Sequence, residues 1–229
     1  MIKIEHTDVY GWEAAIRGMR NPFNSWDKSD SDLDVECFRC DIQGKSDSLC
    51  RLYKCAMLGK NDLKTMKTLS KGGSDHAKYL RMINVTVDVT APLYWWKEYD
   101  TYKIGTVANS CSTMHKIHAK EFELDDFSHE HLGGQPLEAL RFTVLVLNNA
   151  REHYLQTKEK DDWWQMIQLL PSSYNQKRTL QLNYQVLKSM YFARKNHKLD
   201  CWHTFCAWCE ELPYFKEICI DPCVKEVTE

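Results

Sequence analysis

A polar loop, TYKIGTVANSCSTMH (Thr101–His115), follows directly on TAPLYWWKEYD, one of the most aromatic runs of the chain. Hydroxyl and amide side chains can hydrogen-bond a phosphate or the edge of a ring, and Gly105 allows a close backbone approach. Two interpretations are open: a surface loop after a buried element, or a pocket for a flat ring and a phosphate. The hydrogen-bonding candidates are Lys103, Thr106, Asn109, Ser110 and Ser112.

A polar segment at about residues 27–58 contains a second pattern with chemical meaning. Four cysteines lie within 19 residues there, and four thiolates can enclose a tetrahedral metal ion, most simply zinc. An iron–sulfur cluster also accepts four cysteines, and incidental free thiols are the third interpretation. The segment has little apolar content, so a bound metal would help it to fold. The candidate metal ligands are Cys37, Cys40, Cys50 and Cys55.

Two further groups of thiols are weaker candidates. Cys201, His203, Cys206 and Cys209 have metal-like spacing, but their segment is strongly helical and rich in tryptophan, so we expect buried core thiols. Cys111 lies inside the polar loop. No neighbouring residue in the sequence identifies a base for it, so we assign it no nucleophilic role.

The composition limits the classes of protein to consider. With 229 residues, 43% of them hydrophobic, the chain can bury a substantial core. The net charge is -2, from 30 basic and 32 acidic residues, and this predicts no dedicated nucleic-acid binder. No run of about 18 apolar residues predicts a membrane span. The start lacks the apolar core of a secretory signal, so we expect a cytoplasmic protein whose ten cysteines are reduced.

Several long helices and few strands must position these residues, which predicts a mixed α/β or α+β single domain. Period-two alternation of valine and threonine indicates a strand that ends at Pro92, and helical apolar spacing recurs in the C-terminal half. The expected elements are a strand and a helix over 2–22, a helix over 59–73, a strand over 79–92, and helices over 93–103, 136–155, 161–171, 175–197 and 199–212.

Several short motifs lie at definite distances from one another along these predicted elements. Ala91-Pro92 closes the predicted strand, and Thr101-Tyr102-Lys103 follows the next helix. Further on, Asn183 comes twelve residues after the proline of Leu170-Pro171, and Arg194 comes eleven residues later. These features resemble the flavin-dependent thymidylate synthase family, whose signature reads R-H-R-x-x-S-x-N-E-x-S-x-R. The resemblance implies an α+β fold with a central, mainly antiparallel sheet flanked by long helices.

The signature itself is degenerate in this chain. Without a gap, Thr106 falls on its first serine. With a slip of one residue, Asn109, Ser110 and Ser112 fall on its asparagine, glutamate and second serine. Two of the three leading basic residues and the last arginine are absent. Near the start, Ala15–Met19 resembles the family's Ala-Ala-Arg-x-Ser. The resemblance spans a single domain over 1–229, interrupted by the cysteine-rich insertion at about 27–58.

The resemblance implies roles for individual residues. Arg194 would contact the pyrimidine or its phosphate, and Lys103 is the leading cation that is kept. Arg194 and Ser112 are the implied catalytic residues. The implied substrate-binding residues are Glu98, Lys103, Thr106, Asn109, Ser110, Ser112 and Arg194. The implied cofactor-binding residues are His76, Arg81, Thr101, Tyr102, Lys103, Asn183, Gln185 and Ser189.

The implied activity is the reductive methylation of dUMP to dTMP. FAD would carry the hydride, NADPH would supply it, and methylene-tetrahydrofolate would donate the carbon. The implied assembly is a homotetramer. The alternative is a diverged nucleotide-binding homologue without this activity, which would serve as a regulatory or binding protein or as a modifier of another pyrimidine.

Overall fold

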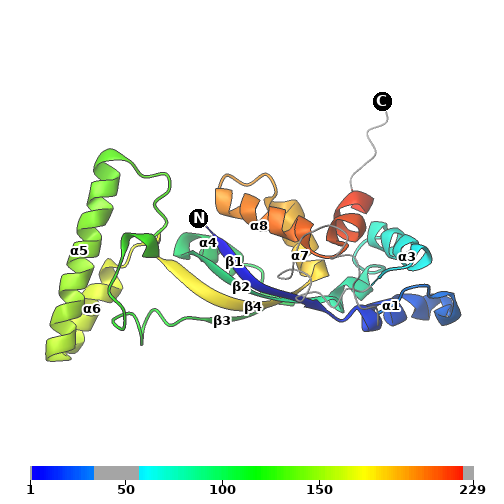
Figure 1. Cartoon of the computed structure of the whole chain (residues 1–229), viewed down its shortest axis with the longest axis horizontal. Helices are drawn as coiled ribbons and strands as arrows, with labels where there is room; N and C mark the ends of the chain where they lie inside the picture. The colour runs from blue at the N-terminus through cyan, green and yellow to red at the C-terminus, as the bar shows by residue number, and fades with distance from the viewer. Residues whose placement is uncertain (1, 34–56, 224–229) are drawn as a thin grey trace, which may run out of the picture. The chain divides into compact units, whose positions relative to one another are not determined.

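The computed structural model describes residues 2–33 and 57–223 (Figure 1). The predicted α+β class is confirmed, since an antiparallel sheet with strand order β1-β2-β4-β3 accompanies helices of up to 24 residues. The strands are β1 (Lys3–Tyr10), β2 (Asn84–Pro92), β3 (Val107–Ser110) and β4 (Asn175–Asn183). The α-helices are α1 (Trp12–Arg20), α3 (Lys60–Lys71), α4 (Leu93–Tyr99), α5 (Gly134–Thr157), α6 (Lys160–Leu169), α7 (Tyr184–Arg194) and α8 (Asp200–Glu211). Among the described residues, no helix is long and apolar enough to cross a membrane.

The described residues form two compact units, and β2 and β4 each contribute residues to both. The α5–α6 unit comprises 2–3, 89–101 and 109–178, and the α7–α8 unit comprises 4–33, 57–88, 102–108 and 179–223. The polar loop is therefore divided between the two units.

The strand predicted to end at Pro92 is present as β2. Val85, Val87 and Val89 are buried, while the residues between them are half-buried. This alternation follows from the period of two along a strand, which sends successive side chains to opposite faces of the sheet. The helices predicted over 59–73, 93–103, 136–155, 161–171 and 199–212 are present as α3, α4, α5, α6 and α8, with shifted ends.

The helix predicted over 175–197 is wrong in its first nine residues, which form β4. Leu180 and Leu182 are buried, whereas Thr179 and Gln181 are exposed, so this stretch has the period of a strand. The helix begins only after Asn183, whose side-chain Oδ1 accepts a hydrogen bond of 3.0 Å from the backbone N–H of Val186. This asparagine cap marks the change from strand to helix.

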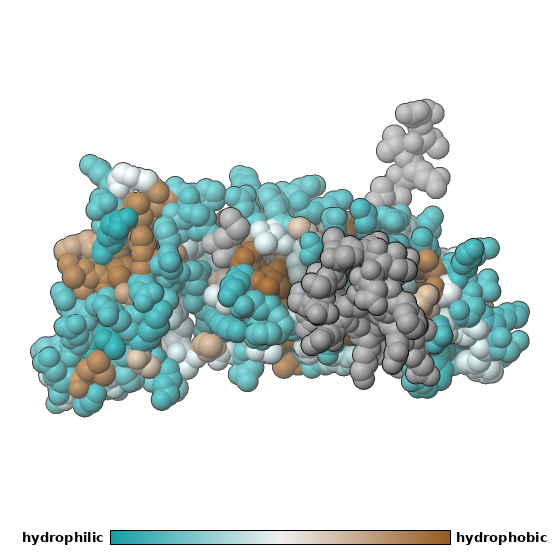
Figure 2. Space-filling model, in the orientation of Figure 1, coloured by the Kyte–Doolittle hydropathy of each residue, from teal (hydrophilic) through white to brown (hydrophobic). Residues whose placement is uncertain are grey.

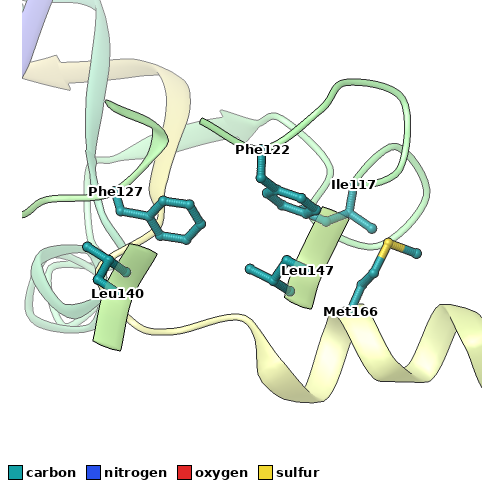
Figure 3. Close-up of a cluster of buried hydrophobic side chains, with 6 residues drawn as sticks. All are labelled: Ile117, Phe122, Phe127, Leu140, Leu147 and Met166. Atoms are coloured by element: carbon teal, nitrogen blue, oxygen red, sulfur yellow. The ribbon is translucent and has the colours of Figure 1, made fainter. Parts of the chain in front are cut away.

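The α5–α6 unit has its own core (Figure 3). Leu140 and Leu147 project from α5 toward aromatic side chains that precede the helix, and α6 packs along α5. Other side chains of α5 are exposed: Phe142 at 65% and Leu145 at 55%. Figure 2 shows hydrophobic side chains gathered over α5. The buried cluster consists of Ile117, Phe122, Phe127, Leu140, Leu147 and Met166.

Aromatic packing holds the start of α7 in the other unit. The ring of Tyr184 meets Trp12 edge-on at 5.7 Å and Phe215 at 5.2 Å between centroids. Its hydroxyl donates a 2.7 Å hydrogen bond to the backbone oxygen of Pro213. Buried edge-to-face pairs add to the stability that burial alone provides. The first turn of α7 is therefore fixed, and with it the direction of the helix that ends at Arg194.

Candidate functional site

Arg194, the last residue of α7, is surrounded by aromatic side chains of the same unit. Its Nε donates a 2.9 Å hydrogen bond to the hydroxyl oxygen of Tyr102. Its guanidinium carbon lies 5.6 Å from the ring centroid of Tyr102 and 4.8 Å from that of Trp202 in α8. A guanidinium stacks on aromatic faces through its charge and its planarity. We call Tyr102, Arg194 and Trp202 the Arg194 group.

The first half of the polar loop lies directly on the start of α7. Gly105 has φ +75°, and a Cβ there would lie 3.0 Å from both Asn183 Nδ2 and Val186 Cγ2. Thr106 Oγ1 donates a 2.6 Å hydrogen bond to the backbone oxygen of Tyr102, which closes the loop on itself. Glycine is required here by both the conformation and the close approach. The structure therefore places the loop along α7, with Gly105 against Asn183 at the start of the helix and Tyr102 against Arg194 at its end.

Helix α7 also presents an acceptor without a partner. The side-chain Oε1 of Gln185 is buried and accepts no hydrogen bond from any described residue. Ser189 is exposed, and its hydroxyl donates 3.0 Å to the backbone oxygen of Gln185. A buried unpaired acceptor is costly, by about 1–3 kcal/mol.

The second half of the loop is held by β4 in the α5–α6 unit. The backbone N–H of Cys111 donates a 2.9 Å hydrogen bond to the oxygen of Lys177. The side-chain Nε2 of Gln176 donates 2.8 Å to the backbone oxygen of Cys111. Asn109 and Ser110, in β3, have exposed side chains. A short strand thus replaces the middle of the predicted loop, and it leaves these two side chains open to solvent.

Ser112 and Thr101 use their hydroxyls locally. Ser112 Oγ accepts hydrogen bonds from the backbone N–H groups of Met114, at 3.3 Å, and His115, at 2.8 Å. Thr101 Oγ1 donates 2.7 Å to the backbone oxygen of Glu98. Such side-chain to backbone bonds are typical of turns. The Ser112 hydroxyl still has its own proton to donate, because both of these bonds use the oxygen as acceptor.

The remaining predicted cations lie in solvent. His76 and Arg81 are exposed in the connection between α3 and β2, where the helical turn Lys78–Arg81 packs on α1 and α7. Lys103 is exposed in the loop. Within the described ranges, none of the three side chains forms a hydrogen bond or an ion pair with another residue.

The aromatic run beside the loop belongs to the core. Trp95, Trp96 and Tyr99 are buried, with 0%, 1% and 2% of their surface exposed. The Arg178 guanidinium carbon lies 4.2 Å from the Trp96 ring centroid, and Arg178 Nη1 donates a 2.7 Å hydrogen bond to Asp100. These tryptophans therefore pack against the protein and do not offer an open stacking face.

Sequence patterns do not indicate Trp202 or Arg178 as neighbours of the site. Trp202 reaches Arg194 from a separate helix, and no local spacing in the sequence reports such a contact. The contact of Arg178 with Trp96 of α4 depends on strand β4, whereas the sequence predicts a helix over this segment.

The candidate metal ligands of the insertion lie outside the described residues, so the metal site stays a prediction. In α8, burial raises the pKa of the Cys206 thiol to about 11, and the nearby charge of Glu210 adds to the effect. Burial also raises the pKa of Cys209. Neutral buried thiols of this kind are poor metal ligands. The described part of the chain contains no cluster of three or more residues suited to a metal ion. The four predicted ligands are Cys37, Cys40, Cys50 and Cys55.

The fold is that of flavin-dependent thymidylate synthases. One structure of the Helicobacter pylori enzyme ThyX, complexed with FAD and dUMP, superimposes with a TM-score of 0.65 at 16% identity, covering 98% of this chain and 99% of that chain. A second structure of the enzyme with FAD and dUMP gives 0.63 at 16% identity with the same coverage. No family model and no curated protein sequence matches the chain. At this identity the likeness establishes the fold.

Proposed function

We propose that the chain is a flavin-dependent thymidylate synthase-like enzyme that binds a dUMP-like pyrimidine nucleotide at Arg194. The observation that carries this proposal is the placement of the guanidinium beside the rings of Tyr102 and Trp202. Arginine offers planar, paired donors that suit both a pyrimidine carbonyl and a phosphate. The similar Helicobacter pylori structures contain FAD and dUMP, which supports a site for both molecules.

Each candidate residue has a proposed task. Arg194 orients the pyrimidine and stabilises negative charge that develops on it, and the Ser112 hydroxyl donates a hydrogen bond. When bound, FAD would supply hydride chemistry, with NADPH as reductant and methylene-tetrahydrofolate as carbon donor. The proposed nucleotide contacts are Glu98, Lys103, Thr106, Asn109, Ser110, Ser112 and Arg194. The proposed flavin contacts are His76, Arg81, Thr101, Tyr102, Lys103, Asn183, Gln185 and Ser189.

We also propose a homo-oligomer, a tetramer as the resemblance implies. Phe142 and Leu145 of α5 support it, because two large apolar side chains are exposed on one helix. A zinc ion in the cysteine-rich insertion and a cytoplasmic location complete the proposal.

A second candidate function is nucleotide binding without thymidylate synthesis. The small number of cations in the loop favours this candidate, because Lys103 is the only basic residue at the three positions where the family signature has R-H-R. The pyrophosphate of FAD carries two negative charges that need such partners. Arg194 Nε, moreover, already donates a hydrogen bond to the hydroxyl of Tyr102, so this donor is engaged within the protein.

The visible spectrum of the purified full chain separates the two candidates. The first predicts flavin absorbance, saturable FAD binding, and rescue of a thymidine auxotroph that Arg194→Ala abolishes. A colourless protein that binds dUMP in calorimetry but fails to bind FAD or to rescue growth supports the second. If neither dUMP nor FAD binds, both candidates are wrong. Metal analysis of the wild type beside Cys37→Ser tests zinc separately, and the absence of zinc and iron in both samples would remove the metal site.

A further inference from the structure

A row of lysines follows one side of α3. Lys60, Lys64, Lys67 and Lys71 are separated by four, three and four residues, which is the spacing of a single helix face. Together with Leu63 and Thr68 they line a shallow depression of about 300 Å³. None of the four ammonium groups forms an ion pair with a described carboxylate. The row spans about 16 Å at about 1.5 Å per residue.

A second depression, of about 360 Å³, adjoins the first. Lys64 and Thr68 line both, and the second adds Arg20, Phe23 and Lys28. Among the described residues that line the two depressions, none is acidic. We call the surface formed by Lys28, Lys60, Lys64, Lys67 and Lys71 the lysine face.

Buried bonds hold Lys28 and the segment around it against α3. Asp62 of α3 accepts hydrogen bonds from Arg20 Nη2, at 2.6 Å, and from Ser31 Oγ, at 2.6 Å. Asp30 accepts from the backbone N–H groups of Asn61, at 2.9 Å, and Asp62, at 3.0 Å. Both carboxylates are therefore engaged inside this clamp, Asp62 with the guanidinium of Arg20 and Asp30 with backbone N–H groups at the start of α3. The clamp holds the backbone that carries Lys28 against α3.

Two exposed aromatic side chains border the lysine face. Phe23 is 57% exposed and lines the second depression, and Trp26 is 52% exposed two residues before Lys28. The indole N–H of Trp26 donates a 2.8 Å hydrogen bond to Asn21 Oδ1, which fixes the ring while most of it stays in solvent. Covering exposed rings of this size with a partner is favourable, because it removes apolar surface from water.

We propose that the lysine face binds single-stranded nucleic acid. Its ammonium groups follow the phosphates, and Phe23 and Trp26 stack on unpaired bases, which is how proteins without base-specific contacts hold single strands. A duplex keeps its base faces inside the stack, and a peptide of acidic residues alone has no ring faces to offer. At about 3.4 Å or more per nucleotide, the row covers at most about five nucleotides. The net charge of -2 does not oppose this binding, because the positive charge is local.

Fluorescence anisotropy of a labelled oligothymidylate of 20 nucleotides, titrated with the full chain, tests the proposal. Affinity should fall about 50-fold between 50 and 200 mM salt if about four phosphates are neutralised. Lys60→Glu/Lys64→Glu should weaken binding at least about tenfold at 50 mM salt. Lys97→Glu/Lys198→Glu is the matched control, since it makes the same charge change at two exposed lysines of other helices and loops, and it should leave the affinity unchanged.

Trp26→Leu tests stacking separately from charge. The oligothymidylate should quench tryptophan fluorescence of the wild type, and the substitution should remove that quenching and weaken binding about fivefold or more. Oligouridylate should bind within about threefold of oligothymidylate, because phosphates and ring faces are common to both. The proposal is overturned if the two double variants bind alike, or if a duplex or polyglutamate of equal charge binds as tightly as the single strand.

Discussion

The Arg194 group and the lysine face treat positive charge in opposite ways. Arg194 is held by a hydrogen bond from its Nε to Tyr102 and by two aromatic rings, so its position is set before any ligand arrives. The lysines of α3 have no described ionic partner and lie along an open surface. A positioned guanidinium suits one small ligand in one orientation, whereas a row of flexible ammonium groups suits a repeating anion.

The surrounding carboxylates differ as well. Beside the lysine face, Asp62 is buried and saturated with hydrogen bonds, so it stabilises the fold and does not compete with a ligand. At the Arg194 group, the Nε of the cation donates a hydrogen bond to the neutral hydroxyl of Tyr102. A substitution in the Arg194 group should therefore leave the lysine face unchanged, and a substitution in the lysine face should leave the Arg194 group unchanged. Each region can serve as the reference for the other.

The largest effect is expected from Asp62→Asn. The substitution leaves the buried guanidinium of Arg20 without its counter-charge and weakens the bonds from Ser29 and Ser31. Breaking a buried pair in this way costs about 3–5 kcal/mol of unfolding free energy. Urea denaturation followed by circular dichroism measures the loss. Asp75→Asn, at an exposed position, is the control and should change stability by less than about 0.5 kcal/mol. Equal stability of the two variants would show that the clamp does not hold the region.

The same carboxylate predicts a dependence on pH. Burial acts to raise the pKa of Asp62, but hydrogen bonds from Ser31, Arg20 and Ser29 outweigh it, and the pKa is lowered. The pKa of Asp62 is therefore lower in the folded protein than the value of about 3.9 expected in the unfolded chain, so ionised Asp62 stabilises the fold above about pH 3.9. This stabilisation is lost as the pH falls through the pKa of the folded state. The wild type should therefore lose its stability advantage over Asp62→Asn below about pH 4. An advantage that stays constant from pH 7 to pH 3 would contradict the assignment.

Arg194→Ala should weaken nucleotide binding about 10- to 150-fold, which corresponds to about 1.5–3 kcal/mol for a hydrogen bond to a charged group. Isothermal calorimetry with dUMP measures the change, and Arg17→Ala, an exposed arginine paired with Glu13, is the control. Oligothymidylate binding should be unaffected. The reciprocal variant Lys60→Glu/Lys64→Glu should keep its dUMP affinity. If either variant weakens both ligands alike, the two regions are not independent.

The fold was largely predictable from the sequence, because long periodic segments such as α3 and β2 report their type locally. The error over 175–183 has a clear cause. This stretch is rich in long polar side chains that also suit helices, and its two buried leucines become informative only with the neighbouring strands in place. The contact of Trp202 with Arg194 is long-range and leaves no local pattern. Net charge likewise concealed the lysine face, since a sum over the chain cannot show how charges are distributed.

Gly105→Ala tests whether the loop must touch α7 to shape the Arg194 group. Alanine at φ +75° is strained, and its Cβ would press on Asn183 and Val186, so we expect a loss of about 2 kcal/mol together with weaker dUMP binding. Gly73→Ala is the matched control, because Gly73 has φ +89° with open space around it, and it should cost about 1 kcal/mol from strain alone. Equal losses in thermal denaturation, with dUMP affinity intact in both, would mean that the contact is unimportant.

The smallest effect is expected from Tyr102→Phe, which removes a single oxygen. The ring stays beside the guanidinium, so the stacking contact is kept, while the hydrogen bond to Arg194 Nε is lost. That bond contributes about 0.5–1.5 kcal/mol. If Tyr102 positions the guanidinium, dUMP affinity should fall about two- to tenfold at nearly unchanged stability. If the phenol instead competes with the nucleotide for Arg194, the affinity should rise. A rise would show that the hydrogen bond between Tyr102 and Arg194 belongs to the free protein alone, and that the guanidinium, like the ammonium groups of α3, is available to a ligand.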